Sequence, residues 1–294
     1  MQKTLIYTLI SILLLISLSA CQNKSNAAKQ KPLIVTTIHP YELIVRELVD
    51  TLFIVQTLLP PNASMYSWSP GPQDMLKLEK ADLIVSNGLG LENNLEKALT
   101  QAGTKHVIAS SFVDKKKLIY NSDEEPGTAN PHVWASPELL IEIIIGLSNE
   151  LGKRYPMSKA VFEGNARMMI MELNQVDSKI MMEKNSYPKA ATMTLNNSFP
   201  YFLKYFKIDS VNATLSNPET DLNPKQSEDL TLQVKSKNIK AVLSNEQINP
   251  TLVQAFARKL KLKIVTCNYV GIATDENTIA DYLWLNWIAL KAGL

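Results

Sequence analysis

Side chains that can bind a ligand lie beyond the ends of several short β-branched runs in this sequence. They offer imidazole, phenol, amide and carboxylate groups, and they are His39, Tyr66, His132, Asn196, Glu246 and Asn268. Open α/β sheets bind ligands beyond the carboxyl ends of their strands. We therefore expect these side chains to meet in one ligand-binding cleft. Because no nucleophile–base pair or pair of acids occurs at a readable spacing, the sequence does not indicate an enzyme.

The runs that must position these side chains alternate with helical patterns. In the first half, the predicted strands are 33–37, 53–59, 81–87 and 106–110, and the predicted helices lie around 41–50, 73–80 and 92–101. The second half repeats this plan, with strands 190–195, 208–213, 239–245 and 262–267 and helices near 198–206, 225–237, 250–260 and 277–291. Strands that alternate with helices favour parallel sheets with both faces covered. The predicted fold class is therefore α/β, with two similar lobes.

The clearest periodic signal lies between the two predicted lobes. Apolar side chains recur there at alternating spacings of four and three, at Phe162, Ala166, Met169, Leu173, Val176 and Ile180. This pattern predicts one continuous helix over 158–184, with Ser158 as its N-cap. At about 1.5 Å per residue the helix is roughly 40 Å long, enough to cross both lobes. We expect the methionines of this helix to serve core filling and helix propensity and not a cofactor; they are Met168, Met169, Met171, Met181 and Met182.

The start of the chain has the layout of a lipoprotein signal peptide, which we assign to residues 1–20. Lys3 precedes an apolar run over 5–18, and small residues precede Cys21. The sequence LSAC (18–21) resembles a bacterial lipobox, which implies that Cys21 becomes the lipidated first residue of the mature chain. Residues 21–31 lack apolar periodicity and are predicted to be a tether. The mature protein is thus expected to be extracytoplasmic and lipid-anchored to a bacterial membrane, in the periplasm or at the cell surface.

Charge and cysteine content exclude several other classes of protein. The formal net charge is only +2 and no dense block of lysine and arginine stands out, so we expect no nucleic-acid partner. Cys267 is the only cysteine besides Cys21, which leaves no intramolecular disulfide framework in the mature domain. Since Cys267 ends an apolar run, we expect it to be a buried small hydrophobe.

A family resemblance becomes specific when several motifs are taken in order. LIVTTIHPYELIVREL, the Pro-rich loop PPNASMYSWSPGPQD, NPHVWASP, NNSFPYFLKYFKI and YLWLNWIALKAGL together resemble the zinc/manganese-type (cluster A-I) solute-binding lipoproteins of ABC transporters. The resemblance covers essentially the whole mature chain. It implies a monomer that works with an ABC transporter permease and holds a divalent metal cargo, Zn or Mn, between two lobes. The corresponding parts of this chain are an N-terminal lobe (32–157), a linking helix (158–184) and a C-terminal lobe (185–294).

The four ligand positions of that family fall on Tyr66, His132, Asn196 and Asn268 in this sequence. The resemblance implies histidine at the first two positions, histidine or glutamate at the third and aspartate at the fourth, so only His132 fits. Zn²⁺ favours imidazole and carboxylate, and Mn²⁺ favours carboxylate and carbonyl oxygen, so neutral amides weaken the site for either ion. If each lost ligand costs at least about 1.4 kcal/mol, the affinity falls tenfold or more per change.

Several substitutes and functions stay open. His39 is either a second imidazole in the cleft or a residue placed for the turn before Pro40, and Glu246 is either a carboxylate ligand or a hydrogen-bonding group behind the ligands. As a tyrosinate, Tyr66 would instead favour Fe³⁺. The chain is then a metal-delivering lipoprotein with altered ligands, the same scaffold with a small polar organic cargo stacked near Trp68 and Trp134, or a surface interaction protein that does not transport.

Overall fold

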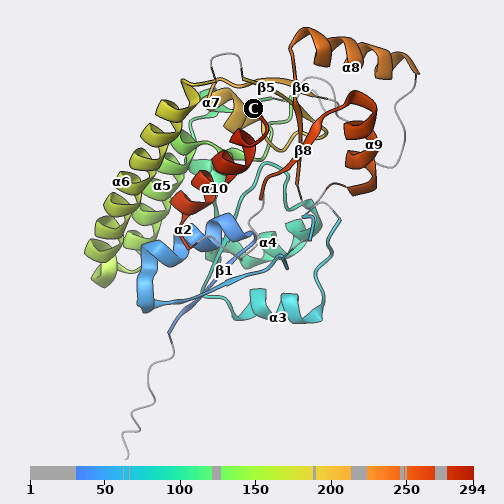
Figure 1. The fold of residues 1–294 in the computed structure, drawn as a ribbon. Coiled ribbons are helices and arrows are strands. Elements are labelled where there is room, and N and C mark those ends of the chain that lie inside the picture. The colour runs from blue at the N-terminus through green and yellow to red at the C-terminus, as the bar shows by residue number, and fades with distance from the viewer. Residues whose placement is uncertain are drawn as a thin grey trace, which may run out of the picture. The chain divides into compact units, whose positions relative to one another are not determined.

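Each half of the chain builds one four-stranded parallel sheet (Figure 1). The first sheet has the order β2-β1-β3-β4 and contains β1 (Leu33–Thr36), β2 (Ile54–Thr57), β3 (Leu83–Ser86) and β4 (His106–Ile108). The second has the order β6-β5-β7-β8 and contains β5 (Ala191–Thr194), β6 (Asp209–Asn212), β7 (Ala241–Ser244) and β8 (Lys263–Thr266). The shared strand order confirms the prediction of two similar α/β lobes.

Helices connect these strands. The computed structural model describes residues 31–294 except 62, 66, 121–126, 188–189, 213–223, 246–247, 249 and 269–276. The helices of the first half are α2 (His39–Val49), α3 (Pro72–Lys80), α4 (Glu96–Ala102) and α5 (Pro137–Arg154). Those that follow are α6 (Lys159–Lys184), α7 (Pro200–Tyr205), α8 (Pro224–Ser236), α9 (Pro250–Leu260) and α10 (Ile279–Lys291).

All eight predicted strands are present, but each is shorter than the apolar run that predicted it. The run 53–59, for example, contributes only residues 54–57 to β2. The central strands β1 and β3 are almost entirely buried, as expected for parallel strands covered on both faces. The residues trimmed from the carboxyl ends of the strands belong to the loops, and these loops carry the candidate ligands.

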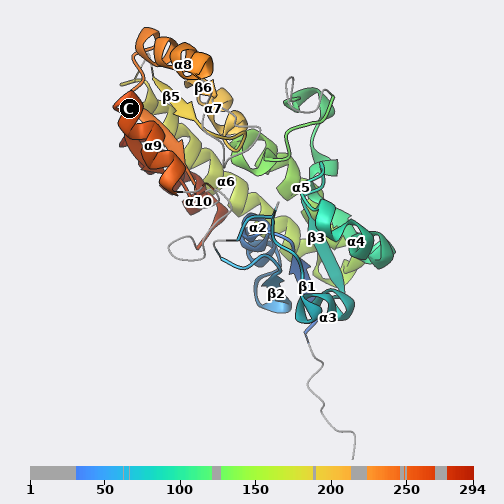
Figure 2. The ribbon, with the colours of Figure 1, turned by 90° about the vertical axis from the view of Figure 1, so that its right-hand side faces the viewer.

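The long helix α6 runs from Lys159 to Lys184, which confirms the predicted linking helix. Phe162, Ala166, Met169, Leu173 and Ile180 form its buried face, as the periodicity predicted. Ser158 occupies the N-cap position, although its side chain makes no capping hydrogen bond. α6 contacts α2 of the first half and α10 of the second, so one rigid element touches both lobes (Figure 2).

α6 also packs along α5, a helix that was not predicted from the sequence. The buried residues of α5 recur at helical spacing, at Leu139, Leu140, Ile143, Ile144, Leu147 and Leu151, so the helical period was present in the sequence. Pro137 at the first turn starts α5, because proline tolerates this position and has a preset backbone angle.

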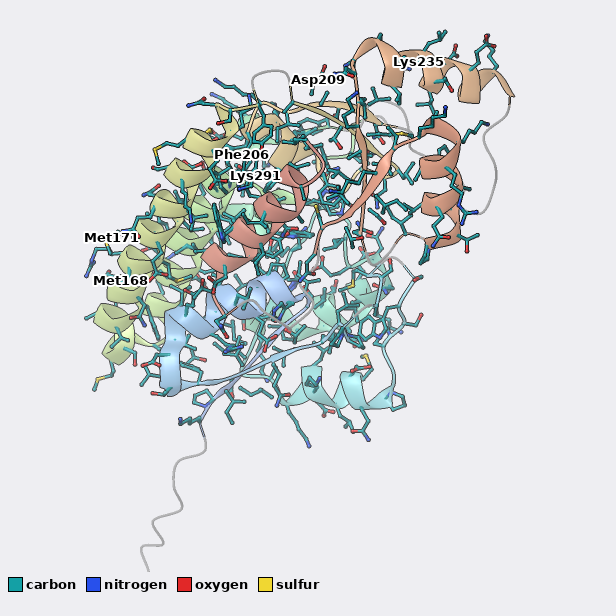
Figure 3. The ribbon with its side chains drawn as sticks, in the orientation of Figure 1. Met168, Met171, Phe206, Asp209, Lys235 and Lys291 are labelled. Atoms are coloured by element: carbon teal, nitrogen blue, oxygen red, sulfur yellow. The ribbon has the colours of Figure 1, made fainter. Side chains whose placement is uncertain are left out.

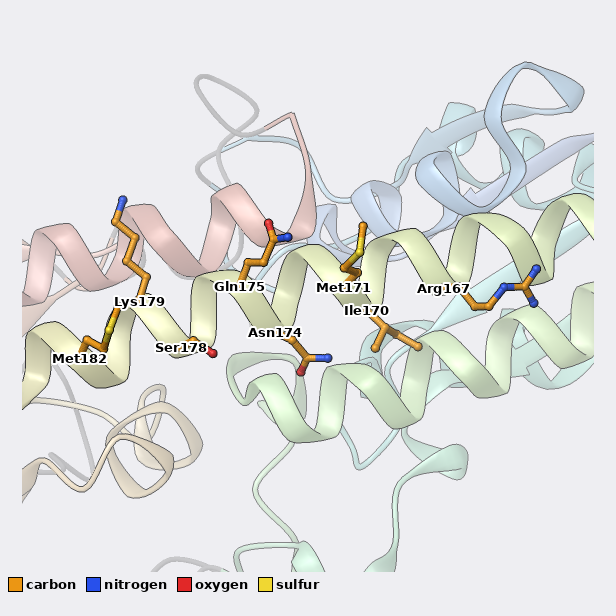
Figure 4. A pocket seen from close by; sticks show the side chains of 8 residues that line it. All are labelled: Arg167, Ile170, Met171, Asn174, Gln175, Ser178, Lys179 and Met182. Atoms are coloured by element: carbon orange, nitrogen blue, oxygen red, sulfur yellow. The ribbon is translucent and has the colours of Figure 1, made fainter.

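The methionines of α6 divide between the two roles expected of them. Met169 is buried in the core, whereas Met168, Met171 and Met182 are 53%, 47% and 68% exposed. Met168 and Met171 lie on the outer side of α6 (Figure 3). Met171 and Met182 belong to a solvent-facing stretch of α6 that also contains Arg167, Ile170, Asn174, Gln175, Ser178 and Lys179 (Figure 4). Only the side of the helix that faces α2, α5 and α10 is covered, so methionines elsewhere on it serve helix propensity alone.

The largest apolar core runs through both halves of the chain. It joins the first sheet to α5 and α6 and continues into α7 and α10. A smaller separate cluster lies around β5, β7 and α9 and includes Met193, Val242 and Phe256. Because the lobes share one core, a large bend between them would expose apolar surface. None of the helices among the described residues has the length and apolarity needed to cross a membrane.

Candidate functional site

His132 lies at the start of a single helical turn, Val133–Ala135, in the segment between β4 and α5. Only 4% of the residue is exposed. Its ring Nδ1 lies 2.9 Å from Oδ1 of Asn130, and the same oxygen accepts the backbone N–H of His132 at 3.0 Å. The Asn130 amide group in turn donates to the carbonyl oxygen of Asn197 at 2.7 Å. Asn130 therefore orients the imidazole and ties it to the loop that follows β5 in the second lobe.

The surroundings of His132 keep its imidazole neutral. Burial lowers the pKa of His132 to about 3, and a hydrogen bond with the backbone of Asn197 opposes this effect only in part. The ring also meets Trp134 edge to face, with 5.3 Å between ring centroids. A neutral imidazole is the form that binds a metal ion or accepts a hydrogen bond from a ligand.

Asn196 and Asn268 are half-buried and follow β5 and β8, as predicted. Oδ1 of Asn196 accepts the backbone N–H of Ser198 at 3.2 Å, which forms a local turn. The backbone carbonyl of Asn268 accepts a hydrogen bond from the side chain of Asn286 on α10 at 2.8 Å. At the carboxyl edge of the second sheet, the Asn196 side chain is thus placed by a local contact, and the backbone of Asn268 is held by α10.

A small enclosed cavity shows that the segments carrying His132, Asn196 and Asn268 meet. Its volume of about 10 Å³ holds roughly one water molecule. Ala135 lines it from the His132 segment, Phe199 from the Asn196 segment, and Cys267 from the Asn268 segment. Cys267 is 2% exposed, which confirms the prediction of a buried small hydrophobe. The cavity is lined by chain neighbours of His132, Asn196 and Asn268 and not by these residues themselves, so their meeting in one ligand site stays a prediction.

His39 opens α2, directly beyond β1, and is 7% exposed. Its Nδ1 lies 2.9 Å from Oε2 of Glu42, and the Thr57 hydroxyl at the end of β2 donates to the same oxygen at 2.6 Å. Burial raises the pKa of Glu42, but the hydrogen bonds from His39 and Thr57 outweigh it, so the net pKa lies below the ordinary value. The carboxylate therefore holds the ring from its Nδ1 side.

Three predicted positions lie outside the described residues: Tyr66, Glu246 and Cys21. The Pro-rich loop around Tyr66 is nevertheless anchored on both sides. The side chain of Asn94 donates hydrogen bonds to the carbonyls of Met65 and Trp68, and Oδ2 of Asp74 accepts the Gly71 N–H at 2.9 Å. The ends of the loop are thus fixed by polar contacts, and Trp68 is half-buried.

Glu92 is a buried carboxylate that was not predicted from the sequence, and it supports the segment that carries His132 through hydrogen bonds. Glu92 accepts hydrogen bonds from the Thr37 hydroxyl at 2.7 Å and from the N–H groups of Asn87 and Gly88 at 2.7 and 3.0 Å. Burial raises the pKa of Glu92 despite these bonds. The Asn87 side chain then donates to the Pro131 carbonyl at 2.9 Å, next to His132. An acidic residue at the end of the apolar stretch GLGLE was the available signal.

Tyr201 of α7 carries a second contact between the lobes that the sequence did not reveal. Its hydroxyl donates to the carbonyl of Asn130 at 2.9 Å and accepts the N–H of Ile119 at 3.0 Å. Burial raises the pKa of Tyr201 to about 12, so the hydroxyl stays protonated. The Asn130 residue that orients His132 is therefore held by both halves of the chain.

Comparison with known proteins identifies the family. Residues 34–289 match the family model described as zinc-uptake complex component A, periplasmic. The chain belongs to this family. Zinc-uptake component A proteins are transport components and not a class of enzymes.

Individual relatives of this component A chain match it over nearly its full length. The high-affinity zinc uptake system protein ZnuA of Bacillus subtilis is 24% identical over 300 residues, covering 94% of this chain and 93% of the relative. A metal ABC transporter substrate-binding lipoprotein of Lactococcus lactis is 24% identical over 301 residues, covering 97% and 95%. The fold matches the periplasmic zinc binding protein TroA of Treponema pallidum with a TM-score of 0.79 at 18% identity, over 90% of this chain and 99% of the other.

The described residues of this component A chain do not form a dense cluster of metal ligands. Among the described residues, no group of three or more histidine, cysteine, aspartate or glutamate side chains is placed to hold a metal ion. In the described part of the chain, the predicted ligand positions offer one oriented neutral imidazole, that of His132, and two half-buried amides, those of Asn196 and Asn268. Imidazole nitrogen and amide oxygen are donors that a divalent ion accepts, and water completes such sites.

Proposed function

We propose that this chain is the solute-binding component of an ABC importer and carries a divalent metal ion, Zn²⁺ or Mn²⁺, to the permease outside the cytoplasm. One observation carries the proposal: in a chain of the zinc-uptake component A family, a buried neutral imidazole is oriented by Asn130 where the two lobes meet. The metal is cargo, so His132 must bind it and also release it. A site with few anionic ligands suits reversible binding.

Four positions make up the proposed site: Tyr66, His132, Asn196 and Asn268. In this proposal the anchored Pro-rich loop presents Tyr66 opposite the two asparagines, with His132 beside it, because prolines reduce the ordering cost of a presented side chain. The proposal also includes Glu246 as a substitute ligand, which would supply a carboxylate. The domain limits 32–157, 158–184 and 185–294 belong to the same proposal.

Attachment and partner follow from the beginning of the chain and from the family. We propose that Cys21 is lipidated, that residues 21–31 hold the domain away from the membrane, and that the monomer docks on an ABC transporter permease. The LSAC sequence supports the anchor, and relatives named as ABC transporter lipoproteins support the partner. Whether the membrane borders the periplasm or the cell exterior depends on the host.

The experiment compares metal affinities of the purified full chain in detergent by isothermal titration calorimetry. Tyr66→His with Asn268→Asp introduces two ligand types of the family and one negative charge. We expect this double variant to bind Zn²⁺ or Mn²⁺ at least a hundredfold more tightly than the parent, which corresponds to about 2.7 kcal/mol. Tyr120→His with Asn174→Asp is the matched control, because both residues are exposed and lie outside the proposed site.

Two results would count against the proposal. If neither parent nor double variant binds either ion, the proposed positions do not form a metal site. If the control pair improves affinity as much as the designed pair, added charge and not the site explains the gain. Native mass spectrometry of the purified parent checks the cargo independently. A bound organic molecule in place of a metal ion would contradict the proposed metal cargo.

The neutral amides favour a polar organic cargo as the second candidate, with hydrogen bonds from Asn196 and Asn268. However, Trp134 is fully buried between Tyr41 and His132, at ring distances of 6.3 and 5.3 Å. It therefore offers no face on which a cargo stacks, contrary to the expectation from the sequence. This burial favours the metal over the organic cargo.

A further inference from the structure

His39 has a polar atom whose surroundings call for a ligand. The residue is 93% buried, and its Nε2 is buried without any hydrogen-bond partner in the described part of the chain. Leaving a buried acceptor unpaired costs about 1–3 kcal/mol in typical proteins. The other ring nitrogen, Nδ1, is occupied by Glu42 at 2.9 Å. The ring is thus held at one nitrogen and left open at the other.

The polar groups behind His39 form a directional chain. The Thr57 hydroxyl donates to Oε2 of Glu42 at 2.6 Å, so the Thr36 hydroxyl, 3.0 Å from the Thr57 oxygen, is the donor in that pair. The Glu42 carboxylate accepts hydrogen bonds only, and His39 must therefore donate its Nδ1–H. With the ring proton on Nδ1, the lone pair of the imidazole form lies on Nε2. Metal-binding histidines commonly have this carboxylate behind the ring, because it fixes the tautomer and strengthens the donor nitrogen.

The place of His39 in the fold also agrees with ligand binding. It lies beyond the carboxyl end of β1, where open α/β sheets bind their ligands. The first turn of α2 also packs against the His132 segment, since the ring of Tyr41 contacts Trp134 at 6.3 Å and Trp134 contacts His132 at 5.3 Å. A residue needed only to begin a helix would not require a carboxylate, because proline at position 40 already favours the first turn.

We propose that Nε2 of His39 is a ligand of the divalent metal cargo, with Glu42 as its positioning residue. The inference rests on the proposed function and adds to it a second imidazole, which replaces one that the altered ligand positions lack. Glu42 acts through the His39 ring and does not bind the ion. Two imidazole ligands give the site more affinity for Zn²⁺ than for Mn²⁺, since Mn²⁺ prefers oxygen donors.

The test uses the three histidines of the chain, His39, His106 and His132. Nitrogen-15 NMR of the histidine-labelled full chain in detergent resolves the two ring nitrogens of each, and single glutamine variants assign them. Without metal, His39 should show a protonated Nδ1 and an unprotonated Nε2. Adding Zn²⁺ should shift the Nε2 signals of His39 and His132. His106, whose Nε2 lies 2.6 Å from the Ser86 hydroxyl, should not shift.

Affinity measurements complete the test. His39→Gln should weaken Zn²⁺ binding at least tenfold, and Glu42→Gln should weaken it by about 10- to 100-fold, as expected for a carboxylate behind a metal-binding histidine. His106→Gln is the matched control and should stay within about twofold of the parent. The NMR measurement on the parent needs no variant, so the proposal remains testable if His39→Gln fails to fold.

The outcomes separate this inference from the proposed function. If Zn²⁺ shifts His132 but leaves His39 unchanged, His39 is not a ligand and the proposed function stands. If the free chain shows His39 protonated at Nε2, the positioning role of Glu42 is wrong. If no histidine shifts and calorimetry detects no Zn²⁺ or Mn²⁺ binding, the proposed function itself fails.

Discussion

Glu47 joins the two lobes through a hydrogen bond whose strength should depend on pH. The carboxylate of this α2 residue accepts the backbone N–H of Ile279, at the start of α10, at 2.8 Å. Burial raises the pKa of Glu47 to about 7, and the negative charges of Glu172 and Asp281 act in the same direction. The Ile279 hydrogen bond and the charge of Arg46 oppose these effects without cancelling them.

The sign of the effect follows from the two pKa values. The folded value of about 7 exceeds the ordinary value of 4.5, so the folded chain binds the proton more tightly than the unfolded chain does. Protonation of Glu47 therefore contributes stability that is fully present below about pH 4.5 and is lost as the pH rises through about 7. The difference corresponds to roughly 3 kcal/mol at most, and partial exposure of the side chain reduces it to about 1–3 kcal/mol.

Glu47→Gln isolates this contribution. Glutamine keeps an oxygen for the Ile279 N–H but does not ionise, so the variant should be more stable than the parent at about pH 8 by about 1–3 kcal/mol. At about pH 5 the two proteins should differ much less. Urea denaturation at both pH values measures the free energies of unfolding. Glu79→Gln, at an exposed position of α3, is the control for loss of a surface carboxylate. Equal pH dependence in the parent and Glu47→Gln would refute the reasoning.

Three further predictions test the supporting structure. Glu92→Ala should lower the free energy of unfolding by about 3–5 kcal/mol in urea denaturation, because it leaves three buried donors unpaired; a loss below about 1 kcal/mol would show that water replaces the carboxylate. Gly146→Ala should destabilise the protein by about 1–3 kcal/mol, because the added Cβ would overlap the Phe112 ring. Gly164→Ala in α6 meets no such neighbour and should stabilise it by about 0.5–1 kcal/mol. Thermal melts that rank the two variants in the reverse order would contradict this packing. Cys21→Ser should release the protein from membranes or leave an unprocessed precursor, and a processed, lipid-labelled Cys21→Ser protein in the detergent phase would exclude the anchor.

Local pattern was sufficient for most of the secondary structure. The β-branched runs predicted all eight strands. The central strands β1, β3, β5 and β7 are mostly buried, as expected for strands covered on both faces, whereas the edge strands β2, β4, β6 and β8 are partly exposed and were found from their β-branched residues alone. The alternation of apolar residues from Phe162 to Ile180 predicted α6, because one covered face leaves a period in the sequence. α5 was missed although its buried leucines and isoleucines recur at helical spacing from Leu139 to Leu151. Which methionines of α6 fill the core was not predicted, because apolar type alone does not show which face of a helix has a neighbour.

For the candidate site, the sequence determined which side chains follow the strands, and only the tertiary structure decided which of them meet. The motif NPHVW singled out His132, but the role of Asn130 depends on Asn197 and Tyr201, which lie 67 and 71 residues away along the chain. The sequence likewise offered His39 as one of two alternatives, and the structure supplied the Glu42 contact and the unpaired Nε2. Hydrogen bonds between distant segments leave no periodic trace, because each depends on where the whole chain places two atoms. Residue types and local periodicity were therefore fixed by the sequence, whereas burial, tautomer and contact between lobes arose only with the complete fold.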